Sequence, residues 1–112
     1  MTFEAFSDMI NSIGLPYAYY QFPDGTDVEP PFICFYFSGQ NGVFADDSIY
    51  ARREHYVVEL YCKNKDFACE AAVEAALVAN DLLYTRNESW IDSEKLIMET
   101  YEGEVLINGR YE

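Results

Sequence analysis

The sequence predicts an α+β fold, in which a mostly antiparallel sheet of about five strands has two helices packed on one face. Two segments place apolar residues at helical spacing, and five others are strand-like runs of apolar and aromatic residues. A short polar connection between the last two runs is typical of an antiparallel hairpin. The expected order is αβββαββ, in a single α+β domain that covers residues 1–112.

The first expected element is a short helix near the N-terminus. Thr2 is a suitable N-cap, because its side-chain oxygen can accept a hydrogen bond from a backbone N–H of the first turn. Gly14 suits the position after the helix, and Pro16 prevents continuation. The apolar residues at helical spacing are Phe3, Phe6, Ile10 and Ile13.

Two aromatic strands, 17–22 and 32–37, follow the helix and are separated by a polar stretch that begins with Pro23-Asp24-Gly25. Both are apolar on both faces, so each is either buried within a sheet or pressed against another chain. The segment 38–49, which includes Phe44, is predicted to be a loop. Its length is unusual for a small domain, and we expect it to be mobile or functional.

The clearest strand is 51–62. Alternation predicts that His55, Val57, Glu59 and Tyr61 point outward, while the core-facing set is Tyr56, Val58, Leu60 and Cys62.

A second helix is expected from about Asp66 to Leu83, capped by Asn64 or Asp66. We predict that its acidic stripe of Glu70, Glu74 and Asp81 faces solvent. The opposite, core-facing stripe is Phe67, Ala71, Ala75, Val78 and Leu82. Val73 and Leu77 lie beside the acidic stripe and are candidates for an exposed contact between subunits, although a wider core face explains them almost as well.

The chain closes with the expected strands 84–91 and 96–107, joined by Asp92-Ser93-Glu94. In the last strand, Ile97, Tyr101, Val105 and Ile107 point one way. Gly103 marks either a bulge or a close approach of the backbone.

The composition predicts a protein that binds other proteins. The chain carries a net charge of −13, yet 17% of its residues are aromatic, with ten Tyr, eight Phe and one Trp. A body this small has a high surface-to-volume ratio, so some rings must lie on its surface, where apolar area marks a partner site. The candidate interface residues are Tyr17, Tyr19, Phe32, Tyr36, Phe44, Val73 and Leu77. The acidic balance argues against binding nucleic acid, which requires a basic face.

Catalytic and metal-binding patterns are weak. His55 is the single histidine, and no nucleophile stands near it at a motif spacing. Asp46-Asp47 could contact a cation but has no further ligands at regular spacing. The odd number of cysteines (Cys34, Cys62 and Cys69) matches no disulfide or zinc framework and suggests reduced thiols in the cytosol. We therefore expect no enzyme activity, cofactor or metal. No signal peptide and no membrane-spanning run is recognised.

Several segments resemble small proteins of tailed phages and prophages of Gram-positive bacteria. The segments are 14–23, 30–36, 46–50, 56–61, 64–67 and 88–96. The resemblance is to tail terminators or tail-completion (head–tail joining) proteins of siphophages. It implies a non-catalytic α/β protein that forms a ring, usually a hexamer, at the end of the tail tube. The implied partners are other copies of the chain, the tail tube and head-completion proteins. The implied locations are the virion after assembly and the bacterial host cytoplasm before it.

Two other classes of function remain open. A small acidic adaptor or inhibitor that binds a host protein would present carboxylates on one face at phosphate-like spacing. A small enzyme or metal-binding domain would depend on His55 and Asp46-Asp47.

Overall fold

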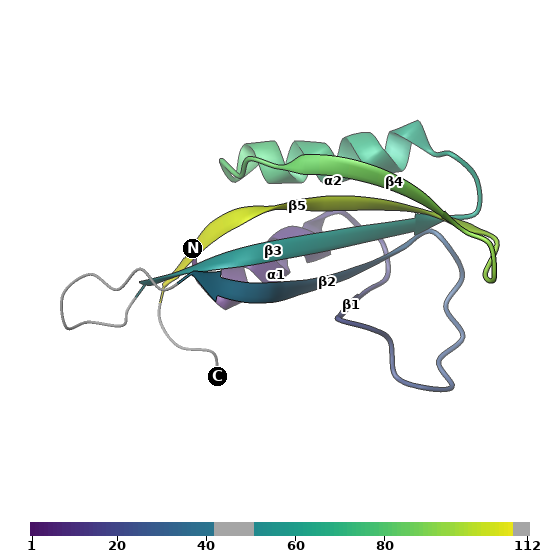
Figure 1. Cartoon of the computed structure of the whole chain (residues 1–112), viewed down its shortest axis with the longest axis horizontal. Helices are drawn as coiled ribbons and strands as arrows, with labels where there is room; N and C mark the ends of the chain where they lie inside the picture. Colours follow the sequence, from purple (N-terminus) through teal and green to yellow (C-terminus); the bar gives the residue numbers. More distant parts are fainter. Residues whose placement is uncertain (42–50, 109–112) are drawn as a thin grey trace.

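One open sheet, with strand order β1-β2-β3-β5-β4, organises the chain (Figure 1). The computed structural model describes residues 1–41 and 51–108. Within these ranges the helices are α1 (Phe3–Ser12) and α2 (Phe67–Ala79). The strands are β1 (Tyr17–Tyr19), β2 (Phe32–Asn41), β3 (Ala51–Cys62), β4 (Thr85–Ile91) and β5 (Leu96–Asn108). The predicted α+β class and the order αβββαββ are confirmed.

The sheet is mixed but mostly antiparallel. β1 runs parallel to β2, whereas the pairs β2–β3, β3–β5 and β4–β5 are antiparallel. β3 lies at the centre and pairs along its whole length with β5, from Ala51 opposite Asn108 to Cys62 opposite Ile97. β4 and the three-residue β1 are the two edges, so the sheet remains open.

Both helices contribute side chains to one core on the same face of the sheet, and Figure 1 shows α1 behind β2 and β3. The predicted cap of α1 is confirmed, because Thr2 Oγ1 accepts a hydrogen bond from the Ala5 N–H at 3.0 Å. Asp66 caps α2 in the same way, through the Cys69 N–H at 3.0 Å. The fully buried aromatic rings of the core are Phe6, Phe35, Tyr56 and Tyr101.

Three element bounds differ from the prediction. β1 ends at Tyr19, because Tyr20 takes a positive φ of 71° and turns the chain away from the sheet. β2 continues to Asn41, so residues 38–41 are strand and not loop. The remainder of the predicted loop, with Phe44 and Asp46-Asp47, lies outside the described residues. α2 ends at Ala79, four residues before the expected end at Leu83.

Gly103 shows the close backbone approach that was one of its two predicted roles. A Cβ atom there would collide with the backbone oxygen of Leu83 and with the Tyr56 side chain. The Tyr56 hydroxyl donates a hydrogen bond of 2.6 Å to this same Leu83 oxygen, and burial raises the pKa of Tyr56 to about 12. The site therefore fixes the segment after α2 against the centre of the sheet.

The cysteines are free and mostly enclosed. Cys34 and Cys62 are buried and Cys69 is half-buried. Burial raises the pKa of Cys34 and of Cys62 to about 11, and it raises the pKa of Cys69 as well. Across residues 1–41 and 51–108, neither helix has the length and apolar character needed to cross a membrane.

Candidate partner-binding surfaces

The face of the sheet opposite the helices is lined with aromatic rings at one end. Alternation along β2 and β3 places Phe32, Tyr36 and Tyr61 on this open face, and Phe32 stands opposite Tyr61 in the register. These two rings stack with centroids 4.9 Å apart and an interplanar angle of 22°. Such pairs are preferred arrangements for aromatic side chains.

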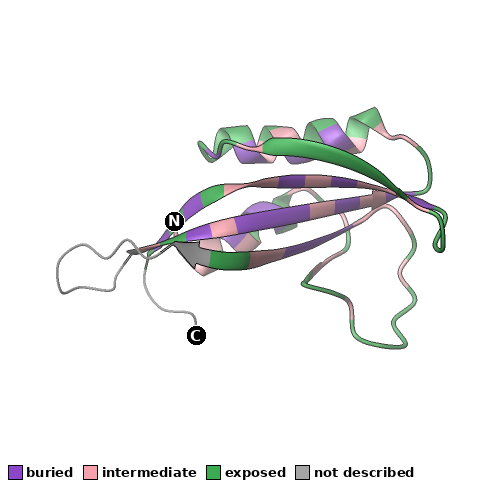
Figure 2. Ribbon diagram, viewed as in Figure 1, coloured by how far each residue is buried: buried purple, intermediate pink, exposed green. Residues whose placement is uncertain are grey.

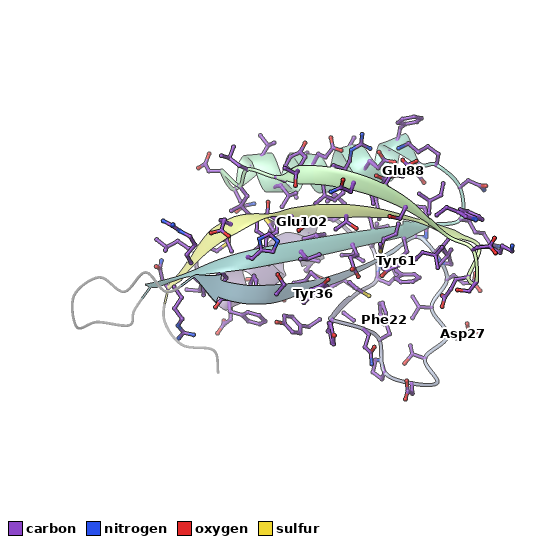
Figure 3. All side chains as sticks on the ribbon, viewed as in Figure 1. Phe22, Asp27, Tyr36, Tyr61, Glu88 and Glu102 are labelled. Atoms are coloured by element: carbon purple, nitrogen blue, oxygen red, sulfur yellow. The ribbon has the colours of Figure 1, made fainter. Side chains whose placement is uncertain are left out.

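The connection between β1 and β2 adds two more rings to the same face. Phe22 packs edge-on against Phe32 at 5.5 Å, and Tyr20 packs edge-on against Tyr36 at 5.3 Å. Phe22, Tyr36 and Tyr61 are labelled in Figure 3. We call the five residues Tyr20, Phe22, Phe32, Tyr36 and Tyr61 the aromatic surface. None of them is fully buried, and Tyr20 is 64% exposed.

A groove of about 720 Å³ opens at this surface. Phe22, Phe32 and Tyr61 line it, Cys34 contributes to its wall, and the β4–β5 hairpin borders it. Lys63 and Lys95 also line the groove. Glu29 and Glu94 line it as well, so the charges of the lining balance in an otherwise strongly acidic protein.

A carboxylate holds two of the tyrosine hydroxyls in place. Tyr61 donates a hydrogen bond of 2.8 Å to Glu59 Oε1, and Tyr36 donates one of 3.4 Å to Glu59 Oε2. Burial, reinforced by Glu59, raises the pKa of both tyrosines above the ordinary value. Both hydroxyls therefore stay protonated at neutral pH and keep donating, which gives the rings fixed orientations.

His55 lies further along the open face and is paired with carboxylates. Its Nε2 lies 2.8 Å from Glu102 Oε1, and its Nδ1 lies 3.6 Å from Glu104 Oε2. Arg53 Nε is 3.9 Å from the other oxygen of Glu104. Glu102 and Glu104 share one face of β5, opposite Val57 and His55 of β3. The arrangement is a chain of exposed ion pairs, which individually contribute little to stability.

The predicted interface residues do not form one site. Phe32 and Tyr36 belong to the aromatic surface. Tyr17 and Tyr19 lie on the helix side, where Tyr17 packs against the core and the Tyr19 ring lies 5.3 Å from Phe35. Tyr19 is nevertheless 47% exposed.

Two of the predicted interface residues are corrected by the structure. Val73 and Leu77 are 0% and 1% exposed, because they form the side of α2 that packs on the sheet. The prediction that these two residues are exposed was wrong, and the alternative, that the core-facing side of the helix is wider, is confirmed for them. Phe44 lies outside the described residues.

The outward side of α2 is apolar, whereas the sequence predicts an acidic one. Its exposed residues are all apolar, and they are Phe67, Ala68, Ala71, Ala72, Ala75, Val78 and Ala79, here called the α2 outer surface. Phe67 is 73% exposed and Val78 is 63% exposed, so their assignment to the core stripe was wrong. Figure 2 shows that exposed residues alternate with buried ones along this helix.

The acidic residues of α2 point inward because they find partners there. Glu70, 5% exposed, binds Arg86 Nη1 of β4 at 2.8 Å and Lys65 Nζ at 2.9 Å. The same two cations contact Glu99 of β5, which is 1% exposed, each at 3.3 Å. One turn further along the helix, Glu74 accepts a hydrogen bond of 2.9 Å from the Tyr101 hydroxyl.

Three carboxylates of this ionic cluster lie close enough together to hold a cation, namely Glu70, Glu88 and Glu99. The Lys65 ammonium contacts all three, at 2.6 Å in the case of Glu88, and so supplies the positive charge. Burial raises the pKa of Glu99 to about 7. Throughout the described part of the chain, every buried side-chain nitrogen and oxygen has a hydrogen-bond partner. The cluster is therefore fully accounted for as an internal ion-pair network.

Some members of both surfaces were missed by the interpretation of the sequence. Tyr61 was correctly placed on the outward side of β3, but Phe22, which packs on Phe32, could not be assigned a face because β1 ends before it. In α2, residue size was the available signal. The stripe of bulky side chains packs on the sheet, whereas the stripe rich in alanine faces outward.

Comparison of the chain with protein-family models finds no match, and comparison with curated proteins finds none that is significant.

Proposed function

We propose that this protein is a non-catalytic structural component of a phage or prophage, a tail terminator or head–tail joining protein that forms a ring at the end of the tail tube. It would reside in the host cytoplasm before assembly and in the virion afterwards. The proposal combines the sequence resemblance with the surface chemistry. Its partners would be further copies of itself, the tail tube and head-completion proteins.

One observation carries the proposal: the protein exposes two different apolar surfaces. The aromatic surface lies on the open face of the sheet, and the α2 outer surface lies on the helix-covered side. A closed ring requires heterologous contacts, in which each subunit presents two unlike patches to its two neighbours. Exposed apolar area on both sides of a small acidic protein is what such contacts require.

The distribution of charge supports a role near DNA without binding it. The net charge of −13 repels a phosphate backbone. Two of the seven basic residues, Lys65 and Arg86, are engaged by the carboxylates beneath α2. A ring with such subunits would let DNA pass through its lumen without sticking.

The alternative of an acidic adaptor or inhibitor receives less support. Its expected feature is an array of free carboxylates on one face. On the open face, Glu59 is bound by tyrosine hydroxyls and Glu102 by His55. No described feature favours binding to a basic host protein over binding to another copy or to the tail.

Deletion of the gene from an inducible prophage tests the proposal. We expect particles whose tails have abnormal length or are not joined to heads in electron micrographs, and rescue by the wild-type gene. A variant with both surfaces altered, Tyr20→Glu with Ala75→Glu, should fail to rescue. The control Asn11→Glu adds one such charge at an exposed position of α1, outside both surfaces, and should rescue. Normal, joined tails in the deletion strain would overturn the proposal.

A further inference from the structure

The α2 outer surface is unusual for this protein because it carries no charge. All seven exposed residues of the helix are Phe, Ala or Val, although 24% of the chain is charged. The only charged residues of the helix, Glu70 and Glu74, are turned towards the sheet. A helix that is apolar on its outer side as well as on its inner side has the character of a buried helix.

We propose that the α2 outer surface of one subunit packs onto the aromatic surface of the next copy of the same chain. This inference rests on the proposed function, and it names the contact by which the ring is built. Each α2 would then lie between two sheets. Val73 and Leu77 would contact its own sheet, and the Ala71, Ala75 and Val78 side would contact the neighbour's sheet.

Charge favours a second copy as the occupant. Two chains with a net charge of −13 repel each other wherever acidic surfaces meet. The α2 outer surface is uncharged, and in the lining of the groove at the aromatic surface Lys63 and Lys95 are balanced by Glu29 and Glu94. Contact between these two surfaces therefore brings two acidic bodies together where repulsion is weakest.

The end of α2 adds complementary charge. Its last turn has no basic residue, and exposed Asp81 follows two positions after the helix. The carbonyl groups at a helix C-terminus carry partial negative charge and favour nearby cations. Lys63 of the neighbouring copy would supply such a cation, whereas Lys95 is already paired with Asp92 of its own chain at 3.0 Å.

The side-chain shapes also fit. Alanine leaves the helix backbone approachable, so the flat rings of Phe32, Tyr36 and Tyr61 can come close to it. Tyrosine combines a large apolar area with a hydroxyl and loses little conformational entropy, which suits it to interfaces. Here Glu59 already fixes two of the hydroxyls, so part of the entropic cost of association has been met within the free subunit.

The two surfaces lie on opposite sides of the sheet, so the contact cannot be symmetric. Helix-to-sheet contact joins unlike patches and leaves one patch of each kind free at the ends of any short oligomer. Subunits joined in this way add to one another head to tail until the oligomer closes into a ring. A contact between two α2 helices, or between two aromatic surfaces, would instead stop at a dimer.

Two variants, each with one surface altered, test this arrangement when they are mixed. Ala75→Glu places a charge in the α2 outer surface, and Tyr20→Glu places one in the aromatic surface. Both positions are exposed, and circular dichroism would confirm that the variants fold. Analytical ultracentrifugation, with and without tail tube protein, measures their assembly. Asn11→Glu is the charge-matched control and should assemble like the wild type.

We expect each variant alone to be monomeric, with self-association weakened at least tenfold. An equimolar mixture should form a heterodimer and nothing larger, because one intact pair of surfaces remains. If the wild type assembles but the mixture stays monomeric, this contact is wrong while the ring proposal stands. Dimers formed by either variant alone would indicate a symmetric contact and would also overturn the proposed helix-to-sheet contact. Wild type that stays monomeric even with tube protein would overturn both proposals.

Discussion

The two helices pack on the same face of one sheet but do so by opposite chemistry. α1 buries Phe6, Met9 and Ile10 and exposes polar residues such as Asp8 and Asn11. α2 buries Glu70 beside Val73 and Leu77, and exposes phenylalanine, valine and alanine. α1 is thus an ordinary amphipathic surface helix, whereas α2 has a second apolar side that is exposed to solvent. The comparison shows that a helix can be attached to its own sheet partly through ion pairs while much of its apolar surface stays exposed.

The largest expected contrast is between two phenylalanines, one in each helix. Phe6 is fully buried against Phe35, Phe37 and Tyr56, and we expect Phe6→Ala to lower the free energy of unfolding by about 3–5 kcal/mol. Phe67 is exposed, and the Lys65 ammonium lies 5.0 Å from the centroid of its ring. Phe67→Ala should therefore cost less than about 1 kcal/mol.

Urea unfolding of the monomer measures both variants. Equal losses would show that the two helices do not differ in the way described, and a large loss for Phe67→Ala would place its ring in the core.

The second contrast concerns the ion pairs that hold α2. Replacing both cations, Lys65→Met with Arg86→Met, leaves the buried Glu70 and Glu99 without compensation. We expect a loss of about 3 kcal/mol in the free energy of unfolding, because an unpaired buried charge is costly.

The matched rescue adds Glu70→Gln and Glu99→Gln to the same protein. Stability should then largely return, because no buried charge remains to be compensated. Chemical denaturation that gave a loss below about 1 kcal/mol for the cation variant would mean that the ion pairs do not hold the helix.

The smallest of the three effects is a dependence on pH. Burial raises the pKa of Glu99 to about 7 from its ordinary value of 4.5. The folded state therefore binds this proton first as the pH falls, and the group makes the protein more stable at pH 5.5 than at pH 8. Proton linkage with these two pKa values gives an increase of about 2 kcal/mol in the free energy of unfolding between pH 8 and pH 5.5.

Glu99→Gln should remove this gain, so the comparison is between the pH profiles of wild type and variant. Parallel profiles from pH 8 to 5.5 would contradict a carboxyl that titrates near neutrality beneath α2.

Much of the sheet and of α1 could be predicted because the signals are local. The alternation of Tyr56, Val58 and Leu60 gave the core side of β3, and Thr2 and Gly14 gave the ends of the first helix. The orientation of α2 was predicted wrongly for a physical reason. Its acids were assumed to seek water, but their partners Arg86 and Tyr101 come from strands that follow the helix.

The aromatic surface was predicted in part. An excess of rings over what a small core can enclose indicated exposed aromatics, and Phe32 and Tyr36 were among those named. The packing of Phe32 on Tyr61 and Phe22 depends on the register of β2 with β3 and on the turn at Tyr20. Neither can be read from composition or from spacing along the chain.

Two of the cysteines can each report on one of the two exposed apolar surfaces. Cys34 lies in the wall of the groove at the aromatic surface, and Cys69 lies on the flank of α2. Because the pKa of both thiols is raised, few thiolates exist at neutral pH, and alkylation of the native protein will be slow. The rate at which a maleimide labels each sulfur therefore records how often that side of the molecule opens. Shielding of either sulfur in a larger assembly can be followed in the same way without introducing a new cysteine.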